Sequence, residues 1–386
     1  MGDREAGSGW IQRARPFPPW TETVVRLLLA LLFLYLFLVG VKGLETGISA
    51  LGSDFVDQVF ASVATPIAGL AAGVLATVLV QSSSVTTATI VGLVGSGVLT
   101  VEAAVPMVMG ANIGTTVTNT LASLGHLRQG AYFQRAFAAA TMHDYFNILA
   151  VAILLPLEVS FGLISNIATW ATNTFGRNIP DVQSSSPIKD AISVPIDWME
   201  GVISDFGWTS AEGPILLGTG LLLIFASLFM ITRQMKAVMS GRMENAINSV
   251  LSRGAGVAAL FVGMLMTMAV QSSSITTSIL VPLVAAGVLT INNAFPVTLG
   301  ANVGTTITAL LASVAAESTD ALTIALAHVS FNVIAILIFY PIAFMRRIPI
   351  RLAEWTAALT MRNKSLVAGY LVGLFLVLPI GILVLS

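Results

Sequence analysis

The 386-residue sequence has no cysteine, only three histidines and few charged side chains. Without cysteine it cannot form disulfides, supply a thiolate nucleophile or hold a metal on sulfur, and three histidines are too few for a histidine-rich metal site. Charged residues make up 10% of the chain, and the formal net charge is -1. The sequence therefore has no basic field that would indicate a nucleic-acid partner, and we expect no cofactor.

Apolar residues dominate the rest of the sequence. They form 56% of the chain, and the mean hydropathy is +0.89, far above that of an ordinary soluble domain. A lipid bilayer must therefore surround most of the chain. The first apolar run, residues 24–41, could be a signal peptide or a membrane helix; its length and the lack of a small-residue cleavage site favour the helix.

The sequence contains an internal duplication. Residues 81–123 align without a gap to residues 271–313, and 25 of the 43 aligned positions are identical. Further along, at an offset of 185, the matching pairs are His143 and His328, Phe146 and Phe331, Asn147 and Asn332, and Pro156 and Pro341. The chain is therefore two copies of one unit.

The charged residues predict how the two copies lie in a membrane, because cytoplasmic loops collect Lys and Arg. Residues 158–213, after Pro156, carry seven acidic and two basic side chains. Residues 346–364, after the equivalent Pro341, carry five basic side chains and one acidic. Equivalent places thus fall on opposite sides of the membrane, which predicts an inverted repeat of the kind found in many secondary transporters.

Two apolar runs are too short to span a membrane. Residues 66–80 number 15 and residues 254–270 number 17, whereas a straight span needs about 20. A polar break after a half-length helix, at corresponding places in both copies, predicts discontinuous or re-entrant helices whose ends meet at the bilayer midplane. Full-length helices are expected at residues 24–43, 135–157, 214–232, 320–345 and 365–385.

The predicted fold class is an all-α polytopic membrane protein with two inverted-topology repeats. We expect a cytoplasmic N-terminal segment (1–23), a first repeat unit (24–157), an external loop (158–213), a second repeat unit (214–345) with a cytoplasmic connector (233–253), a cytoplasmic loop (346–364) and a final helix (365–386).

Each short apolar run ends in the tetrapeptide QSSS. Its amide and hydroxyls supply oxygens for an alkali cation and donors for an oxyanion, and a helix that starts just after Ser84 or Ser274 would add free N–H groups. The alternative is that the serines bond back to preceding carbonyls of their own helix. The candidate anion-binding residues are Gln81, Ser82, Ser83, Ser84, Gln271, Ser272, Ser273 and Ser274.

A third QSSS, at residues 183–186, shows that the tetrapeptide alone is a weak signal. It lies in the polar segment, with no apolar helix on either side and no counterpart in the other repeat. We expect it to be a solvated linker.

A second repeated motif, G-A-N-x-G-T-T-x-T, begins at Gly110 and again at Gly300. Its glycines permit a helix break or a close backbone approach. Beyond the expected break, threonine hydroxyls and freed carbonyls could hold a cation, unless the threonines bond back to their own helix. The candidate cation ligands here are Asn112, Thr115, Thr118, Asn302, Thr305 and Thr308.

The two motif regions carry almost no charge. Residues 254–316 have no charged side chain, and residues 61–127 have only Glu102. An oxyanion site without Lys or Arg must draw positive charge from helix N-termini and from bound cations. Because anion and cation would then each need the other, the pattern predicts coupled binding.

These motifs, with RAF at residues 135–137, HDYFN at 143–147 and LLPLE at 154–158, resemble the type II sodium-phosphate cotransporter family. The resemblance covers about residues 66–158 and residue 254 to the C-terminus. It implies symport of one divalent inorganic phosphate with two or three sodium ions across the cell membrane, and a substrate centre at the two QSSS elements. It also implies a sodium site at Gln271, Ser272, Ser273, Thr305 and Thr308.

Asp144 and Asn147 are further candidate sodium ligands. An intramembrane carboxylate is a functional candidate by default, and the repeat has Val329 in place of Asp144. In the resembled family, members with Asp at this position move net charge and members with Gly are electroneutral, which implies a third sodium site. The alternative is a structural pairing of Asp144 with Arg135. His143 and His328 could line the pathway or simply pin helices together.

The sequence also departs from the resembled family. Some members place Gln and Asp in the loop that here runs from His126 to Gln129, so a sodium ligand there is doubtful. Animal members have cystines and continue past the last helix, whereas this chain has no cysteine and stops at Ser386, which implies a bacterial member.

A channel and an intramembrane serine protease are the rival hypotheses for the function. Half-length helices that meet at the midplane can also build pores. The protease is disfavoured because no G-x-S-x-G elbow is present, and no Lys or Asp accompanies the QSSS serines. We therefore expect a transporter and not an enzyme.

Overall fold

The computed structural model describes residues 19–63, 65–175, 187–239, 241, 243, 245–247, 256–316 and 318–386. Helices form throughout these ranges, which contain no strand. Six helical stretches are long and apolar enough to cross a membrane: Trp20–Leu51, Ala131–Phe161, Thr209–Met239, Ile291–Ala315, Thr319–Phe339 and Ser365–Leu385. The prediction of an all-α polytopic membrane protein is therefore confirmed. The third QSSS, at residues 183–186, lies outside the described residues.

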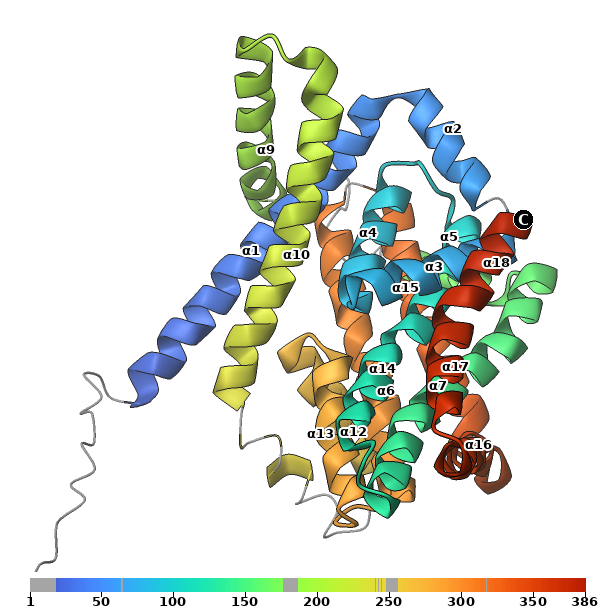
Figure 1. The fold of residues 1–386 in the computed structure, drawn as a ribbon. Coiled ribbons are helices and arrows are strands. Elements are labelled where there is room, and N and C mark those ends of the chain that lie inside the picture. The colour runs from blue at the N-terminus through green and yellow to red at the C-terminus, as the bar shows by residue number, and fades with distance from the viewer. Residues whose placement is uncertain are drawn as a thin grey trace, which may run out of the picture.

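The helices follow the duplicated plan along the chain (Figure 1). The first half contains α1 (Pro19–Leu51), α2 (Ser53–Ser62), α3 (Pro66–Val80), α4 (Ser83–Gly95), α5 (Val101–Thr115), α6 (Val117–Ser123), η1 (Leu124–His126), α7 (Ala131–Phe161) and α8 (Leu163–Phe175). The second contains α9 (Pro187–Asp205), η3 (Thr209–Ala211), α10 (Glu212–Met239), α12 (Val257–Val270), α13 (Ser273–Ala285), α14 (Ile291–Ala315), α15 (Thr319–Phe339) and α16 (Ala343–Arg362). The chain ends with α17 (Ser365–Val372), the π-helical turn η4 (Gly373–Val377) and α18 (Leu378–Leu385).

Helices of each half pack against helices of the other half. Helix α7 packs against α13 and α16 of the second half, and α15 packs against α4 and α8 of the first. In Figure 1, α3 and α4 lie in the upper part of the bundle, whereas α12 and α13 lie in the lower part. Equivalent helices thus occupy opposite ends of one bundle.

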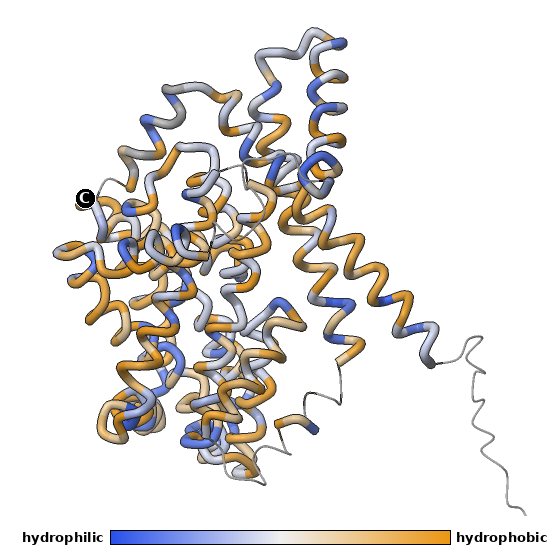
Figure 2. Tube along the Cα trace, turned by 180° about the vertical axis from the view of Figure 1, so that it is seen from behind, coloured by the Kyte–Doolittle hydropathy of each residue, from blue (hydrophilic) through white to orange (hydrophobic). Residues whose placement is uncertain are grey.

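Helices α1 and α10 pack along each other at one side of the bundle (Figure 1). Glycines allow their close contact: a Cβ on Gly47 would lie 2.3 Å from the amide N of Leu217, and one on Gly220 would lie 2.4 Å from that of Leu44. Figure 2 shows long apolar stretches on both helices, as expected for membrane spans. Helix α1 therefore has the packing of a membrane helix, as the length of the first apolar run predicts.

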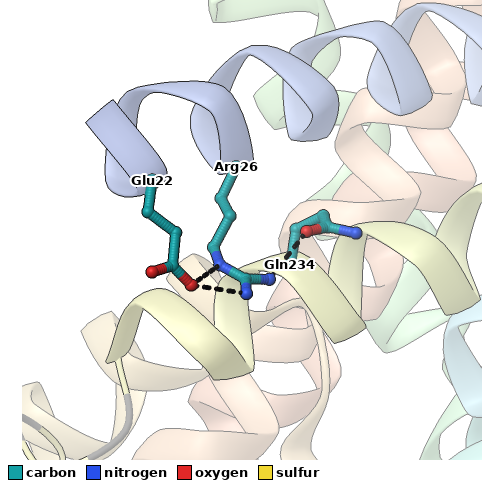
Figure 3. A network of polar contacts seen from close by, with 3 residues as sticks. All are labelled: Glu22, Arg26 and Gln234. Atoms are coloured by element: carbon teal, nitrogen blue, oxygen red, sulfur yellow. Dashed lines mark hydrogen bonds and ion pairs between the residues drawn. The ribbon is translucent and has the colours of Figure 1, made fainter. Parts of the chain in front are cut away.

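A polar contact joins α1 and α10 near one end of the pair (Figure 3). Arg26 forms an ion pair with Glu22 at 2.8 Å, and its Nη1 donates to Oε1 of Gln234 at 3.2 Å. Gln234 lies at the start of the predicted connector, residues 233–253. The contact brings this connector close to the N-terminal end of α1, as expected if both segments face the same side of a membrane.

The half-length helices form as predicted. Helix α3 covers residues 66–80 as expected, and α12 starts at Val257, three residues later than the predicted 254. Each is followed by a turn in which the glutamine adopts the left-handed region, with φ of 57° at Gln81 and 59° at Gln271. In the described ranges these are the only non-glycine residues with positive φ, so the duplication extends to an unusual backbone conformation.

The predicted break at the second G-A-N-x-G motif is wrong. Helix α14 runs without interruption through residues 300–308, and only the first repeat is interrupted, at Thr116 between α5 and α6. The glycines serve close packing instead. A Cβ on Gly110 would lie 2.1 Å from the carbonyl oxygen of Leu70, and one on Gly300 would lie 1.8 Å from that of Leu260.

Other boundaries differ from the prediction in both directions. Helix α15 is shorter than predicted: it ends at Phe339 instead of residue 345, since Pro341 cannot continue the hydrogen-bond ladder. The predicted loops 158–213 and 346–364 hold helices: α8 packs on α15, α9 on α1, and α16 on α7. Glu158 accepts hydrogen bonds from the first N–H groups of α8, from Ile164 at 2.5 Å and Ser165 at 3.2 Å.

Candidate functional site

The two QSSS turns, residues 81–84 and 271–274, face each other across one cavity of about 280 Å³. Apart from the two turns, the lining comes from their neighbours Val80 and Val85 and from Phe225, Leu228, Phe229 and Thr232 of α10. No charged side chain is among the residues that line it. The eight predicted anion-binding residues are therefore brought together from positions 190 residues apart.

Two helix N-termini open at this cavity. Helices α4 and α13 begin inside the tetrapeptides, at Ser83 and Ser273, and not just after Ser84 and Ser274 as predicted. Ser82 caps α4, since its Oγ accepts from the N–H of Val85 at 3.3 Å and its carbonyl from that of Thr86 at 3.2 Å. The N–H groups of the first turn and the positive ends of two helix dipoles thus lie at an uncharged cavity.

Ser272 repeats this cap in the second half. Its Oγ accepts from the N–H of Ile275 at 3.4 Å, and its carbonyl accepts from that of Thr276 at 3.4 Å. Because the extended backbone of the capping serine is also the same, with φ of -152° at Ser82 and -153° at Ser272, the two turns are close copies in conformation as well as in sequence.

A group of oxygens lies where the second turn meets the first repeat. Oγ1 of Thr308 is 2.9 Å from Oε1 of Gln271 and 3.3 Å from Oγ of Ser84. Oγ of Ser84 is also 3.4 Å from the backbone oxygen of Gln271. Hard cations bind to oxygen ligands, and amide, carbonyl and hydroxyl oxygens are among them. The corresponding contact in the first repeat joins Thr118 to Oε1 of Gln81 at 3.2 Å.

The other motif threonines bond back to their own helices. Thr115 donates to the carbonyl of Ala111 at 2.8 Å, and Thr305 donates to that of Ala301 at 3.0 Å. This is the alternative weighed for the motif, although each hydroxyl oxygen keeps lone pairs that could accept a cation.

A buried chain of side chains joins α5, α7 and α14. Nε2 of His143 is 2.5 Å from Oδ1 of Asn302, whose Nδ2 donates to Oδ1 of Asn147 at 2.7 Å. Asn147 in turn donates to the backbone oxygen of Asn112 at 2.7 Å, and Nδ2 of Asn112 donates to the carbonyl of Val108 at 3.1 Å. The predicted cation ligands Asn112, Asn147 and Asn302 thus lie together, but they bond mainly to one another. His143 links α7 to α14 through its hydrogen bond to Asn302.

Asp144 lies in a second buried polar cluster. Its Oδ2 accepts hydrogen bonds from Tyr370 at 2.8 Å and from Thr120 at 3.1 Å, whereas its buried Oδ1 has no partner. Arg135 does not pair with it, because Nε of Arg135 donates to the carbonyl of Ala285 at 2.7 Å. No Lys or Arg forms an ion pair with Asp144 in the part of the chain that the structure describes. A buried carboxylate oxygen without a cation or donor is a candidate site for an ion.

The cluster connects to the second QSSS turn through residues that the motifs did not single out. Nδ2 of Asn119, next to Thr120, donates to Oγ1 of Thr277 at 2.7 Å, and Thr277 donates to the carbonyl of Ser273 at 2.8 Å. A comparison of the two repeats could have singled out Asn119 and Thr120. They align with the apolar residues Ala309 and Leu310, just as Asp144 aligns with Val329. For Tyr370, which follows both repeats, no sequence signal exists.

The fold and these paired turns define a polytopic α-helical membrane protein, built from a duplicated unit, with an uncharged polar centre between its halves. A family profile described as Na+/Pi-cotransporter matches residues 36–172 and 222–374. The chain therefore belongs to this family, as the sequence motifs predict.

Curated relatives support the same membership. The chain is 33% identical over 457 residues to sodium-dependent phosphate transport protein 2B of Pongo abelii and of Homo sapiens, covering 95% of this chain and 66% of each relative. It is 33% identical over 449 residues to protein 2A of Ovis aries, covering 98% of this chain and 70% of that relative. The chain thus spans about two thirds of the length of these mammalian relatives. No solved structure matches it. The bacterial origin stays a prediction.

Proposed function

We propose that this protein is a sodium-coupled symporter of inorganic phosphate, driven by the sodium gradient across the cell membrane. The observation that carries the proposal is the convergence of two uncharged QSSS turns, each at a helix N-terminus, on one cavity. The family membership and the names of the relatives, which are sodium-dependent phosphate transport proteins, support the same conclusion. Because family and relatives are transporters, the protein is not an enzyme.

Divalent phosphate is held, in this proposal, by donors alone. The residues at the starts of α4 and α13 line the cavity, and helix N-termini favour anions, so their backbone N–H groups and the hydroxyls of both turns are the proposed donors. Partial charges of two helix ends do not balance two full negative charges. Sodium ions must therefore accompany phosphate, since either ion alone would leave an uncompensated charge in a medium of low dielectric constant.

We place sodium first at the oxygen group formed by Gln271, Thr308 and Ser84. It adjoins the phosphate cavity, so that a cation there lies beside the anion. Ser272, Ser273 and Thr305 complete the proposed set in the second repeat. In the first repeat, Thr115 and Thr118 are the equivalent candidates. A cation at Asn112, Asn147 or Asn302 would have to replace the hydrogen bonds that these residues make to each other, so these are the weakest members of the set.

Asp144 is the proposed ligand of a third sodium ion. Its unpartnered Oδ1 and the lack of a paired Lys or Arg among the described residues support this role. Three sodium ions with one divalent phosphate carry one net positive charge, for which 100 mV contributes about 2.3 kcal/mol. Transport is therefore electrogenic in this proposal.

The two repeats are, in our proposal, inverted in the membrane, with the N-terminus and residues 233–253 and 346–364 cytoplasmic and residues 158–213 external. The placing of α3 and α4 opposite α12 and α13, and the contact of Arg26 with Gln234, support it (Figures 1 and 3). Asp205 and Arg347 are exposed positions for a test. In whole cells, a cysteine at Asp205 should react with an impermeant maleimide from outside, and one at Arg347 only after permeabilisation. The opposite pattern would contradict the orientation.

The function is tested by uptake of radiolabelled phosphate into proteoliposomes with and without an inward sodium gradient. We expect saturable uptake that accumulates phosphate above the external concentration only while the gradient lasts. Non-saturating entry that merely equalises the two concentrations would indicate a channel and contradict the proposal. Labelling of the QSSS serines by a serine-reactive phosphonate would instead favour the protease hypothesis.

A further inference from the structure

The polar cluster around Asp144 exists in only one half of the molecule. The first repeat has Asn119, Thr120 and Asp144 where the second has Ala309, Leu310 and Val329. The duplicated fold therefore does not require polar groups at these places, because the other half packs apolar side chains there. A buried cluster that appears in one repeat alone and contains a carboxyl group needs a reason beyond packing.

The hydrogen bonds of Asp144 fix the direction of its carboxylate. Both donors, Thr120 and Tyr370, bond to Oδ2, and the side chain is 0% exposed. Oδ1 receives no hydrogen bond from the described residues. A carboxylate that existed only to link helices would lower its burial cost by using both oxygens. Here two donors hold one oxygen and leave the other without a hydrogen bond in the described part of the chain.

Tyr370 comes from a part of the chain that belongs to neither repeat. It lies on α17, one turn before the π-helical turn η4. Its ring is held by edge contacts with Phe137, at 5.9 Å between centroids, and with Phe375, at 6.3 Å, and it lies 6.3 Å from the ring of Tyr145. Such packing fixes the ring and therefore the direction of its hydroxyl.

We propose that Tyr370 is a positioning residue for the cation site at Asp144. With Thr120 it holds Oδ2, so that Oδ1 presents one full negative charge to a sodium ion in a fixed direction. The final helix thereby becomes part of a site that the duplicated units do not complete alone. This inference rests on the proposed function, because it deepens the role of Asp144 as a sodium ligand.

The test measures phosphate uptake into proteoliposomes at saturating phosphate while the sodium concentration is varied. Tyr370→Phe removes only the hydroxyl, and we expect the half-saturating sodium concentration to rise about tenfold, as for loss of one hydrogen bond to a charged group. Thr120→Val should shift it in the same direction without touching the aromatic cluster. Tyr145→Phe is the matched control: its ring neighbours Tyr370, but its hydroxyl bonds to Thr356, so we expect no shift.

A double variant separates positioning from a general structural effect. In the Asp144→Gly background, Tyr370→Phe should change the sodium dependence no further, since no carboxylate is left to orient. An equal shift in both backgrounds, or wild-type sodium dependence in Tyr370→Phe, would overturn the proposal.

The effect of sodium on the melting temperature of the purified variants gives a second readout. In Tyr370→Phe, a higher sodium concentration should be needed to raise the melting temperature, even if transport is lost. If the wild type showed this sodium effect, weakened in Tyr370→Phe, but no sodium-driven phosphate uptake, the proposed function would fail and the assignment of Tyr370 would stand.

Discussion

The two repeats share a sequence but not a set of contacts. In the second, Gln271 is half-buried and accepts hydrogen bonds from Thr308 and Ser84, whereas in the first Gln81 is exposed and accepts a hydrogen bond from Thr118. Among the described residues, Nδ1 is buried without a partner in both His143 and His328, but Nε2 of His143 meets Asn302, which also bonds to Asn147, whereas Oδ1 of Asn332 is buried without a partner. One structure thus holds two copies of a unit in two different environments.

Such a difference is what alternating access would require if the two repeats are inverted, as we propose. If the halves exchanged environments, the contacts of one would be lost as those of the other formed, and the cavity between the QSSS turns would open to the opposite side. We interpret the asymmetry as one of two states of a transporter.

The largest expected effect comes from the feature that the repeats share most closely. Ser83→Ala and Ser273→Ala should each abolish sodium-driven phosphate uptake, because both serines begin helices at the same cavity. Ser185→Ala, in the third QSSS, is the control and should leave uptake at the wild-type rate. Equal effects at all three serines would remove the distinction between the turns and the isolated tetrapeptide.

Because Gly110 and Gly300 both allow close helix packing, replacing either should cause a similar loss of stability. Gly110→Ala and Gly300→Ala place a methyl group against a backbone carbonyl that cannot yield. We expect each to destabilise the folded protein by about 1–3 kcal/mol or more, measured as a lower melting temperature in detergent. Gly369→Ala has open space at its Cβ and should melt like the wild type. A helix break at Gly300 would instead make that substitution tolerable.

These glycines show where prediction from the sequence stops. The duplication, the half-length helices and the QSSS turns follow from apolar run lengths and repeated letters, and α3 has its predicted bounds. The continuity of α14 could not be predicted from the sequence. A glycine can permit either a helix break or a close helix contact, and the sequence does not distinguish the two until the neighbouring helix is known. Tyr370 is 226 residues from Asp144, and no spacing rule connects them.

Asp144 offers a further test of the difference between the two repeats, because the second repeat has the apolar Val329 at the equivalent position. Asp144→Gly should keep phosphate uptake but make it electroneutral, since the third sodium ion loses its charged ligand. The measurement is uptake at subsaturating sodium into liposomes whose potential is set with potassium and valinomycin. Wild-type uptake should accelerate with an inside-negative potential, and variant uptake should not. A wild type that ignores the potential would contradict the third sodium site.

The smallest expected effect distinguishes the two histidines. His143→Ala breaks the hydrogen bond to Asn302 and leaves a buried amide oxygen unsatisfied, which costs about 1–3 kcal/mol. Nδ1 has no partner in either ring, but only the His143 ring makes a hydrogen bond among the described residues, so the loss of melting temperature in His328→Ala should be smaller. Equal losses would show that the asymmetry between the repeats has no energetic consequence.

The central claim is that an uncharged centre between two repeats binds phosphate and sodium only together. Its most direct test is to measure radiolabelled sodium and radiolabelled phosphate uptake in the same proteoliposomes. The proposal predicts that both ions enter in a fixed ratio of about three to one, and that removing either ion from outside stops the entry of the other. Phosphate entry that continues undiminished when choline replaces sodium would contradict it.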